Sequence, residues 1–220
     1  MMRPVRLYLA GPAGSGKTMV AEMLVRGYGF ARVSLGGLCR EEARRRGLPY
    51  DRATLQAMGD MLRGTDPARL AVLAWMRIQG MAGPVVIDGV RLNAEAKWLR
   101  ARGAVGAGLL APEDVRQSRL LGRDDCAGVP AHATEAQATA VPVDFALDTT
   151  GGAVGALQSR VRLLVARAHL LAVEPRRPAN RLTCAEPRGA NTGPTPPVEG
   201  GRTKAFPVRS VLCVVEPNPQ

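Results

Sequence analysis

A glycine-rich segment near the N-terminus constrains the fold of this chain more than any other feature. It reads Gly-Pro-Ala-Gly-Ser-Gly-Lys-Thr over residues 11–18 and matches the pattern G-x-x-x-x-G-K-[ST] at every required position. An apolar run over residues 5–10 precedes it, and the spacing of Val20 and Leu24 predicts a helix after it. This strand, loop and helix are the required context of a phosphate-binding loop, which argues against a chance glycine turn.

The residues of this loop predict a site for a phosphate chain. Glycines let the backbone turn its N–H groups inward, and the start of the helix adds its positive dipole end. Lys17 can reach the β- and γ-phosphates of a nucleotide, and the Thr18 hydroxyl can bind Mg²⁺. We therefore expect ATP and Mg²⁺ as ligands. The residues predicted to bind the nucleotide are Gly11, Ala13, Gly14, Ser15, Gly16, Lys17 and Thr18.

Strand-like and helix-like segments alternate along residues 1–174. The predicted strands are residues 5–10, 31–34, 85–88, 105–111 and 145–148. Between them, Asp66-Pro67, Asn93 and Pro112-Glu113-Asp114 predict helix starts, and a last helix is expected over residues 153–173. The alternation predicts a three-layer α/β/α sandwich with a mostly parallel five-stranded sheet, the fold of P-loop nucleoside triphosphate hydrolases.

The end of the chain has a different composition. Residues 175–220 hold nine of the 17 prolines and show no sustained periodicity. We therefore expect a P-loop domain over residues 1–174 and a proline-rich, disordered tail over residues 175–220. Residues 208–215 could form one short strand against a partner.

Charge and hydropathy limit the function classes. No apolar run reaches the ~18 residues needed to cross a bilayer, and the N-terminus lacks the pattern of a signal peptide, so we expect a cytoplasmic protein without membrane contact. The net charge of +11 suits a polyanion, but aromatic residues make up only 4% of the chain. Few stacking side chains and no nucleic-acid motif favour a small phosphorylated substrate over nucleic acid.

Two further segments combine a strand end with an arginine. Residues 34–40 read Ser-Leu-Gly-Gly-Leu-Cys-Arg, so Arg40 offers a planar fork to a phosphate early in a helix. Residues 85–91 read Val-Val-Ile-Asp-Gly-Val-Arg, an apolar strand that ends in Asp88 and is followed by Arg91. Arg40 could instead belong to a solvated helix face, and Asp88 could form a turn with the glycine after it.

These segments resemble the Ser-Thr-Gly-Asp-x-x-Arg and Asp-Gly-x-x-Arg stretches of nucleoside monophosphate kinases, adenylate kinase included. The resemblance implies that Arg40 and Arg91 bind the acceptor phosphate and that Asp88 holds Mg²⁺ through water. Gly37 stands where that family has an acidic residue, which puts an acceptor contact from this position in doubt. Residues 34–63 also look like a less-studied group of P-loop proteins related to adenylate, cytidylate and dephospho-coenzyme A kinases.

A third segment places three arginines on one helix face: Arg116, Arg119 and Arg123. It is similar to the Arg-x-x-Gly-Arg run at the entry to the lid of the same kinases, which implies that Arg119 and Arg123 close over the nucleotide and take part in catalysis. These arginines could instead form a basic solvent face. The expected lid covers residues 122–142, and it is reduced, because residues 124–142 contain no Arg or Lys. Residues 148–151 resemble the loop that borders adenine.

We therefore predict ATP- and Mg²⁺-dependent phosphoryl transfer to a small phosphorylated acceptor, foremost a nucleoside monophosphate. Lys17, Arg91, Arg119 and Arg123 are the predicted catalytic residues, and Thr18 and Asp88 the predicted metal ligands. The reduced lid is also compatible with an ATP-binding switch without kinase turnover. Dephospho-coenzyme A kinase-like activity and nucleic-acid end kinase activity are further alternatives. The sequence does not predict an oligomeric state.

Overall fold

The core of the molecule is one sheet of five parallel strands in the order β2-β3-β1-β4-β5. The computed structural model describes residues 4–121, 138, 140–150 and 154–173. The strands are β1 (Arg6–Ala10), β2 (Ala31–Ser34), β3 (Val85–Val90), β4 (Val105–Leu110) and β5 (Phe145–Asp148). The predicted fold class is confirmed, and the sheet is parallel throughout.

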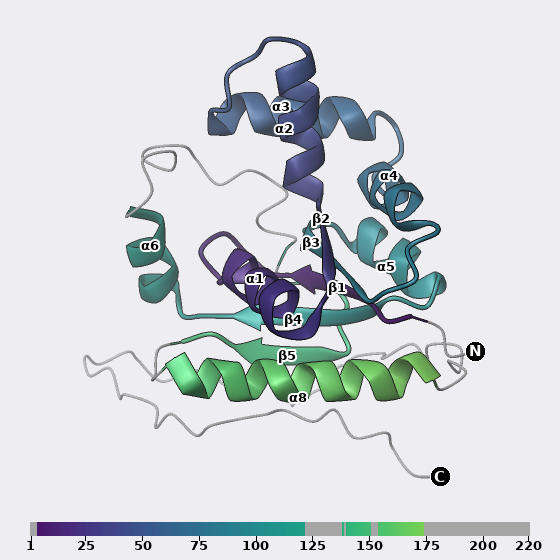
Figure 1. Ribbon diagram of the computed structural model, residues 1–220. Coiled ribbons are helices and arrows are strands. Elements are labelled where there is room, and N and C mark those ends of the chain that lie inside the picture. The colour runs from purple at the N-terminus through teal and green to yellow at the C-terminus, as the bar shows by residue number, and fades with distance from the viewer. Residues whose placement is uncertain (1–3, 122–137, 139, 151–153, 174–220) are drawn as a thin grey trace, which may run out of the picture.

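Helices cover both faces of this sheet (Figure 1). The helices of the described residues are α1 (Lys17–Tyr28), α2 (Leu35–Arg45), α3 (Arg52–Arg63), α4 (Arg69–Ile78), α5 (Asn93–Ala101), α6 (Glu113–Leu121) and α8 (Val154–Val173). Helices α1 and α8 pack on one face, and α2, α4 and α5 contribute to the core on the other. Helices α2 and α3 pack against each other and stand beyond one end of the sheet, at the top of Figure 1.

Alternation along the central strands builds these two cores. In β1, Leu7 and Leu9 point to the core shared with α1 and α8, whereas Tyr8 points to the core shared with α4 and α5. Val86 and Ile87 of β3 divide between the two cores in the same way. All these side chains are fully buried, as expected for a parallel sheet covered on both faces.

The chain reverses its direction across the sheet at β1. From β1 it crosses to β2 and β3 on one side, and from β3 it passes to β4 and β5 on the other. Ligands of open parallel sheets bind at such a switch point, outside the carboxyl ends of the strands. The segments that follow β1, β2, β3 and β4 all leave the sheet at this edge.

The structure differs from the sequence prediction at several element boundaries. β3 continues to Val90, so Asp88 lies inside the strand; a register shift after Leu9 and the positive φ of Gly89 accommodate the extension. Helix α4 begins at Arg69 because Asp66 forms a turn with the Ala68 N–H instead of capping the helix. Within the described residues, no helix is long and apolar enough to span a lipid bilayer.

Candidate active site

The phosphate-binding loop lies between the end of β1 and the first turn of α1. Gly11 and Gly14 in this loop have positive φ angles of 140° and 75°. A Cβ atom on Gly11 would lie 2.6 Å from the Leu109 carbonyl oxygen, and one on Gly14 would lie 2.5 Å from the Arg116 carbonyl oxygen. Both positions therefore require glycine, for the backbone conformation and for the close approach of β4 and α6.

Lys17 is the first residue of α1, and its ammonium group lies over the loop. The Nζ atom donates to the carbonyl oxygens of Gly11 at 2.7 Å and of Pro12 at 2.6 Å. Gly16 precedes the helix and no side chain caps it, so the first N–H groups of α1 can point at a bound anion. The Thr18 hydroxyl, on an exposed side chain, adds an oxygen ligand beside them. Such an arrangement suits a triphosphate with its metal ion.

Asp88 lies beside the loop in an ion pair that the sequence did not predict. On β3 it stands in register with Leu9 of β1 and with Ser34 of β2. Asp88 is only 4% exposed, and its Oδ2 atom accepts a hydrogen bond from Arg32 Nη2 at 2.6 Å. Among the described residues, Arg32 is the one side chain that donates to this carboxylate. Its Oδ1 atom is therefore the oxygen left for a ligand.

The oxygen donors near the loop fit a hydrated magnesium ion. In the part of the chain that the structure describes, no group of three or more His, Cys, Asp or Glu side chains could hold a metal. Thr18 and Asp88 line the same cavity and supply the oxygen ligands that Mg²⁺ prefers. Because this ion keeps several waters and binds phosphates in nucleotide sites, two protein oxygens suffice.

Two arginines of α6 donate hydrogen bonds to backbone carbonyl oxygens of the phosphate loop. Arg116 Nη1 donates to the Ala13 carbonyl oxygen at 3.1 Å. Arg119 Nη1 donates to the Gly14 carbonyl oxygen at 3.1 Å, and its Nη2 donates to the Thr149 carbonyl oxygen at 2.6 Å. The helix face expected from the spacing of these arginines thus points at the loop, where both side chains contact backbone.

Thr149, which follows β5, forms a hydrogen bond with the backbone of the phosphate loop. It is 3% exposed, and its hydroxyl lies 2.9 Å from the carbonyl oxygen of the fully buried Ser15. A Cβ atom on Gly16 would lie 3.3 Å from the Thr149 side chain. The start of the segment that resembles an adenine-bordering loop therefore packs against the phosphate loop. Arg123 and most of the predicted lid, residues 122–137 and 139, lie outside the described residues.

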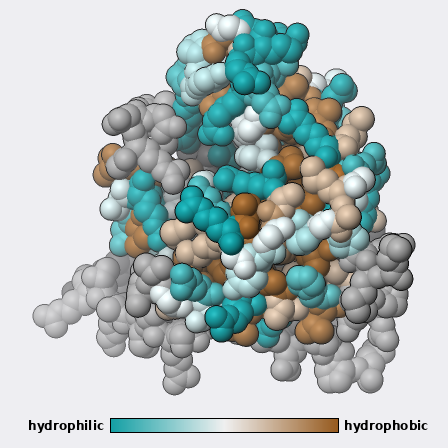
Figure 2. Space-filling model, in the orientation of Figure 1, coloured by the Kyte–Doolittle hydropathy of each residue, from teal (hydrophilic) through white to brown (hydrophobic). Residues whose placement is uncertain are grey.

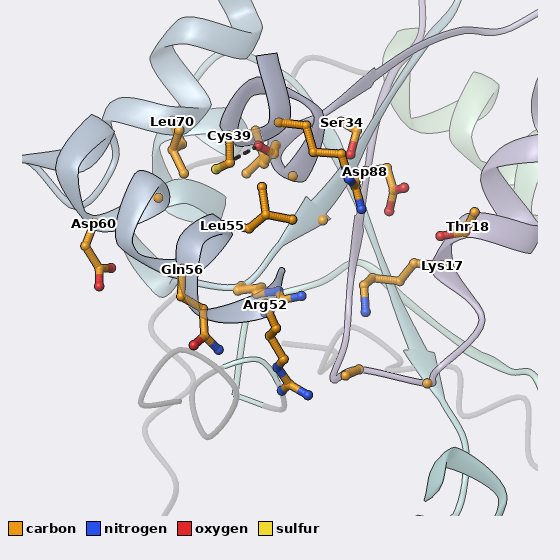
Figure 3. Close-up of a pocket in the computed structure, with 18 of the residues that line it drawn as sticks. Lys17, Thr18, Ser34, Cys39, Arg52, Leu55, Gln56, Asp60, Leu70 and Asp88 are labelled. Atoms are coloured by element: carbon orange, nitrogen blue, oxygen red, sulfur yellow. Dashed lines mark hydrogen bonds between the residues drawn. The ribbon is translucent and has the colours of Figure 1, made fainter. Parts of the chain in front are cut away.

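A cavity of about 270 Å³ extends from the phosphate loop to α2 and α3. Figure 3 shows Lys17, Thr18 and Asp88 on one side of it and Arg52, Leu55 and Gln56 of α3 across from them. Six basic side chains line it, namely Lys17, Arg32, Arg40, Arg52, Arg63 and Arg91, against the two carboxylates Asp60 and Asp88. Hydrophilic residues also gather over the α2–α3 part at the top of Figure 2. The cavity is therefore suited to an anion.

The structure brings both predicted acceptor arginines to this cavity. Arg40 projects from α2 as an exposed side chain, and no described residue forms a hydrogen bond or ion pair with its guanidinium. Arg91 follows β3, and its backbone N–H donates to Glu95 Oε2 at 3.0 Å. Burial raises the pKa of the neighbouring Cys39 thiol, and the positive charge of Arg63 opposes this shift only partly. Cys39 is therefore a protonated, apolar part of the cavity wall at neutral pH.

Sequence reasoning missed five charged residues around the site: Arg32, Arg52, Asp60, Arg63 and Glu95. Arg32 stands inside a short strand, where nothing in the local pattern indicates a ligand. Arg52 and Arg63 lie at the two ends of α3, which the sequence analysis did not delimit as a helix. Glu95 could have been found, because an acid at the third position of a helix commonly caps its start.

Known protein families match the part of the chain that forms this site. A family model described as an AAA domain matches residues 10–125, which include the phosphate loop, Asp88 and the predicted acceptor arginines Arg40 and Arg91. A UPF0200 protein from Aeropyrum pernix is 34% identical over 128 residues, which cover 56% of this chain and 68% of that protein. The chain belongs to the AAA domain and UPF0200 families.

A UPF0200 protein from Methanothrix thermoacetophila is 36% identical over 93 residues, 41% of this chain, and the chain spans half of that relative's length. Among solved structures, a gluconokinase from Sinorhizobium meliloti aligns with a TM-score of 0.50 at 20% identity, covering 78% of this chain and 95% of that one. A shikimate kinase from Acinetobacter baumannii, in complex with shikimate, aligns with a TM-score of 0.51 at 16% identity, covering 74% and 94%.

At these identities the structural likeness concerns the fold alone, and that fold is the P-loop kinase fold. Together with the family matches, it confirms the recognition of a P-loop, nucleoside monophosphate kinase-like family.

Proposed function

We propose that this protein transfers the γ-phosphoryl group of ATP to a small phosphorylated acceptor, foremost a nucleoside monophosphate. The observation that carries the proposal is the cationic cavity that opens directly from the phosphate loop. Its volume of about 270 Å³ lies near the lower end of the ~300–1,000 Å³ range of small-molecule pockets. A small anion is the acceptor that such a cavity favours.

The donor side would be held by the loop and by the start of α1. Backbone N–H groups of residues 13–18 and the Lys17 ammonium would bind the β- and γ-phosphates, and Lys17 would leave the loop carbonyl oxygens to do so. Mg²⁺, held by Thr18 and through water by Asp88, would neutralise negative charge on the phosphates. Arg119, and with it Arg123, would close over the nucleotide from the lid side.

The acceptor side would be held by Arg40 and Arg91. An oxygen of the acceptor phosphate would attack the γ-phosphorus in line while the bond from that phosphorus to the bridging β–γ oxygen breaks, which yields ADP and a phosphorylated acceptor. A phosphate oxygen carries no proton that must be removed first, so the step needs positioning and charge stabilisation more than a general base. This fits a cavity that among its described lining residues contains arginines but no histidine.

A coupled assay of ADP release tests the proposal. ATP and Mg²⁺ would be supplied with AMP, CMP, GMP, UMP or dephospho-coenzyme A as the acceptor, and the matched nucleosides would be the control without a phosphate. We expect turnover well above the background without acceptor for at least one monophosphate and none for its nucleoside. Turnover equal to background for every compound would reject the kinase proposal in favour of an ATP-binding switch.

A further inference from the structure

A fully buried carboxylate, Glu95, lies behind the acceptor side of the cavity. Its Oε2 atom accepts hydrogen bonds from the backbone N–H groups of Arg91 at 3.0 Å and of Leu92 at 3.1 Å. Its Oε1 atom accepts from Arg63 Nε at 3.2 Å and from Arg63 Nη2 at 3.1 Å. A buried charge is costly unless it is paired, and Glu95 uses both oxygens to join the α3 arginine to the segment that carries Arg91.

Arg63 has donors to spare after this pairing. A guanidinium has five N–H groups, and three contacts account for its described partners: two to Glu95 and one to Asp60. The contact of Nη1 with the exposed Asp60 carboxylate is long, at 3.4 Å. The side chain is 14% exposed and lines the cavity. At least two of its N–H groups are therefore left for an anion in that cavity.

Gly59 makes the room that this guanidinium occupies. Gly59 lies one helical turn before Arg63 in α3, and a Cβ atom there would stand 3.1 Å from Arg63 Nη1. The same atom would be 3.6 Å from the Cys39 sulfur, on the opposite helix α2. A side chain at position 59 would press on the end of the arginine, so the guanidinium lies in room that this glycine leaves.

We propose that Arg63 is a third acceptor-phosphate residue beside Arg40 and Arg91, and that Glu95 is the residue that positions it. The inference rests on the proposed function, since it assumes a phosphorylated acceptor in this cavity. Glu95 neutralises Arg63, so Arg63 supplies oriented N–H donors more than net charge. Lysine cannot reproduce this role, because an ammonium lacks the planar fork that contacts a carboxylate and a phosphate at once.

Calorimetric titration of the full chain tests the role of Arg63. AMP, CMP, GMP and UMP would each be titrated into protein saturated with a non-hydrolysable ATP analogue and Mg²⁺. Hydrogen bonds to charged groups are worth about 1.5–3 kcal/mol, so Arg63→Met should lower the affinity for the best-binding monophosphate by roughly 10- to 100-fold. The affinity for the ATP analogue should stay within about twofold, because Lys17 and the loop are untouched.

Two further variants control for charge and for folding. Arg69→Met removes an exposed arginine of α4 that lies outside the cavity, and it should bind the monophosphate like the wild type. Gly59→Ala suits a helix and leaves Glu95 with its partner, but its Cβ atom would shift the guanidinium end by a few tenths of an ångström, so it should also weaken monophosphate binding, by less than Arg63→Met does. If the wild type binds no monophosphate, the proposed function falls together with this inference. If the wild type binds one and Arg63→Met binds it equally well, this inference alone is overturned.

A double-mutant cycle tests Glu95. Glu95→Gln keeps an oxygen for the backbone N–H groups but removes the charge that orients Arg63. It should lower the affinity for the monophosphate about tenfold in the wild-type background. In the Arg63→Met background it should have no further effect on that affinity. An equal weakening in both backgrounds would mean a general structural role and would overturn the assignment of Glu95.

Discussion

The two halves of the candidate site are built by different means. On the donor side, side chains bind the backbone: Lys17 donates to two loop carbonyl oxygens, and Arg116 and Arg119 donate to the carbonyl oxygens of Ala13 and Gly14. On the acceptor side, side chains bind one another, as Arg63 and Glu95 do across α3 and α5. On the donor side the anion-binding groups thus belong to one loop that other segments hold in place, whereas the acceptor-side groups come from three separate segments.

This difference separates what the fold requires from what the substrate requires. A loop of N–H groups binds any triphosphate, because the main chain offers the same groups whatever the side chains are. An acceptor pocket made of side chains can change its ligand with a few substitutions. The same fold is found in a gluconokinase and a shikimate kinase among its structural neighbours, and one fold can carry sites for different substrates.

The largest effect is expected from the donor side. Lys17→Ala removes the ammonium that would stabilise the β- and γ-phosphates in the transition state. Removal of one such group typically costs about 10²- to 10³-fold in kcat, which steady-state kinetics of the coupled assay would measure. Lys97→Ala, at an exposed position of α5, is the matched control and should leave kcat unchanged. Turnover of Lys17→Ala within about twofold of wild type would contradict the assignment of the loop.

A smaller loss is expected where the two halves meet, at Asp88. Asp88→Asn preserves size but removes the charge that pairs with Arg32 and that would hold the hydration shell of the metal. Outer-shell metal partners are worth about 10- to 100-fold in activity, so kcat should fall by that factor and more Mg²⁺ should be needed for half-maximal rate. Asp66→Asn, in a turn outside the cavity, is the control. An unchanged Mg²⁺ dependence of Asp88→Asn would exclude the metal role.

More of the donor side than of the acceptor side could be predicted from the sequence. The phosphate loop and the α/β fold class could be predicted, because local spacing and the alternation of strands and helices indicate them, and Asp88 was indicated by the family resemblance. The Arg32–Asp88 pair and the Arg63–Glu95 pair could not, because their members are 56 and 32 residues apart and meet only through the sheet order and the packing of α3. Nor could the sequence foresee that Arg116 and Arg119 contact the loop backbone, since helix spacing gives a face but not its partner.

The loop and the helix after it should differ in how much stability a glycine substitution costs. Gly14→Ala in the loop combines a φ of 75° with a Cβ position 2.5 Å from a backbone oxygen, so it should lower the free energy of unfolding by at least about 1–2 kcal/mol and weaken ATP binding. Gly27→Ala in α1 has open space around it and should leave stability equal or higher by up to about 1 kcal/mol. Urea unfolding measures both, and equal values would show that the loop does not need its glycine.

The smallest expected effect lies on α2, away from the cavity. Arg45 and Arg46 donate hydrogen bonds to Glu42 and lower the pKa of its carboxyl to about 2 from an ordinary value of 4.5. Because the folded state binds this proton less readily than the unfolded chain, Glu42 contributes stability above pH 4.5 that is lost as the pH falls towards 2. The contribution is small, since solvent screens such pairs. Glu42→Gln should flatten this part of the pH dependence of the urea midpoint. A pH dependence equal to that of the wild type would mean that α2 gains no stability from this ion pair and is held by its packing against α3, β3 and α4.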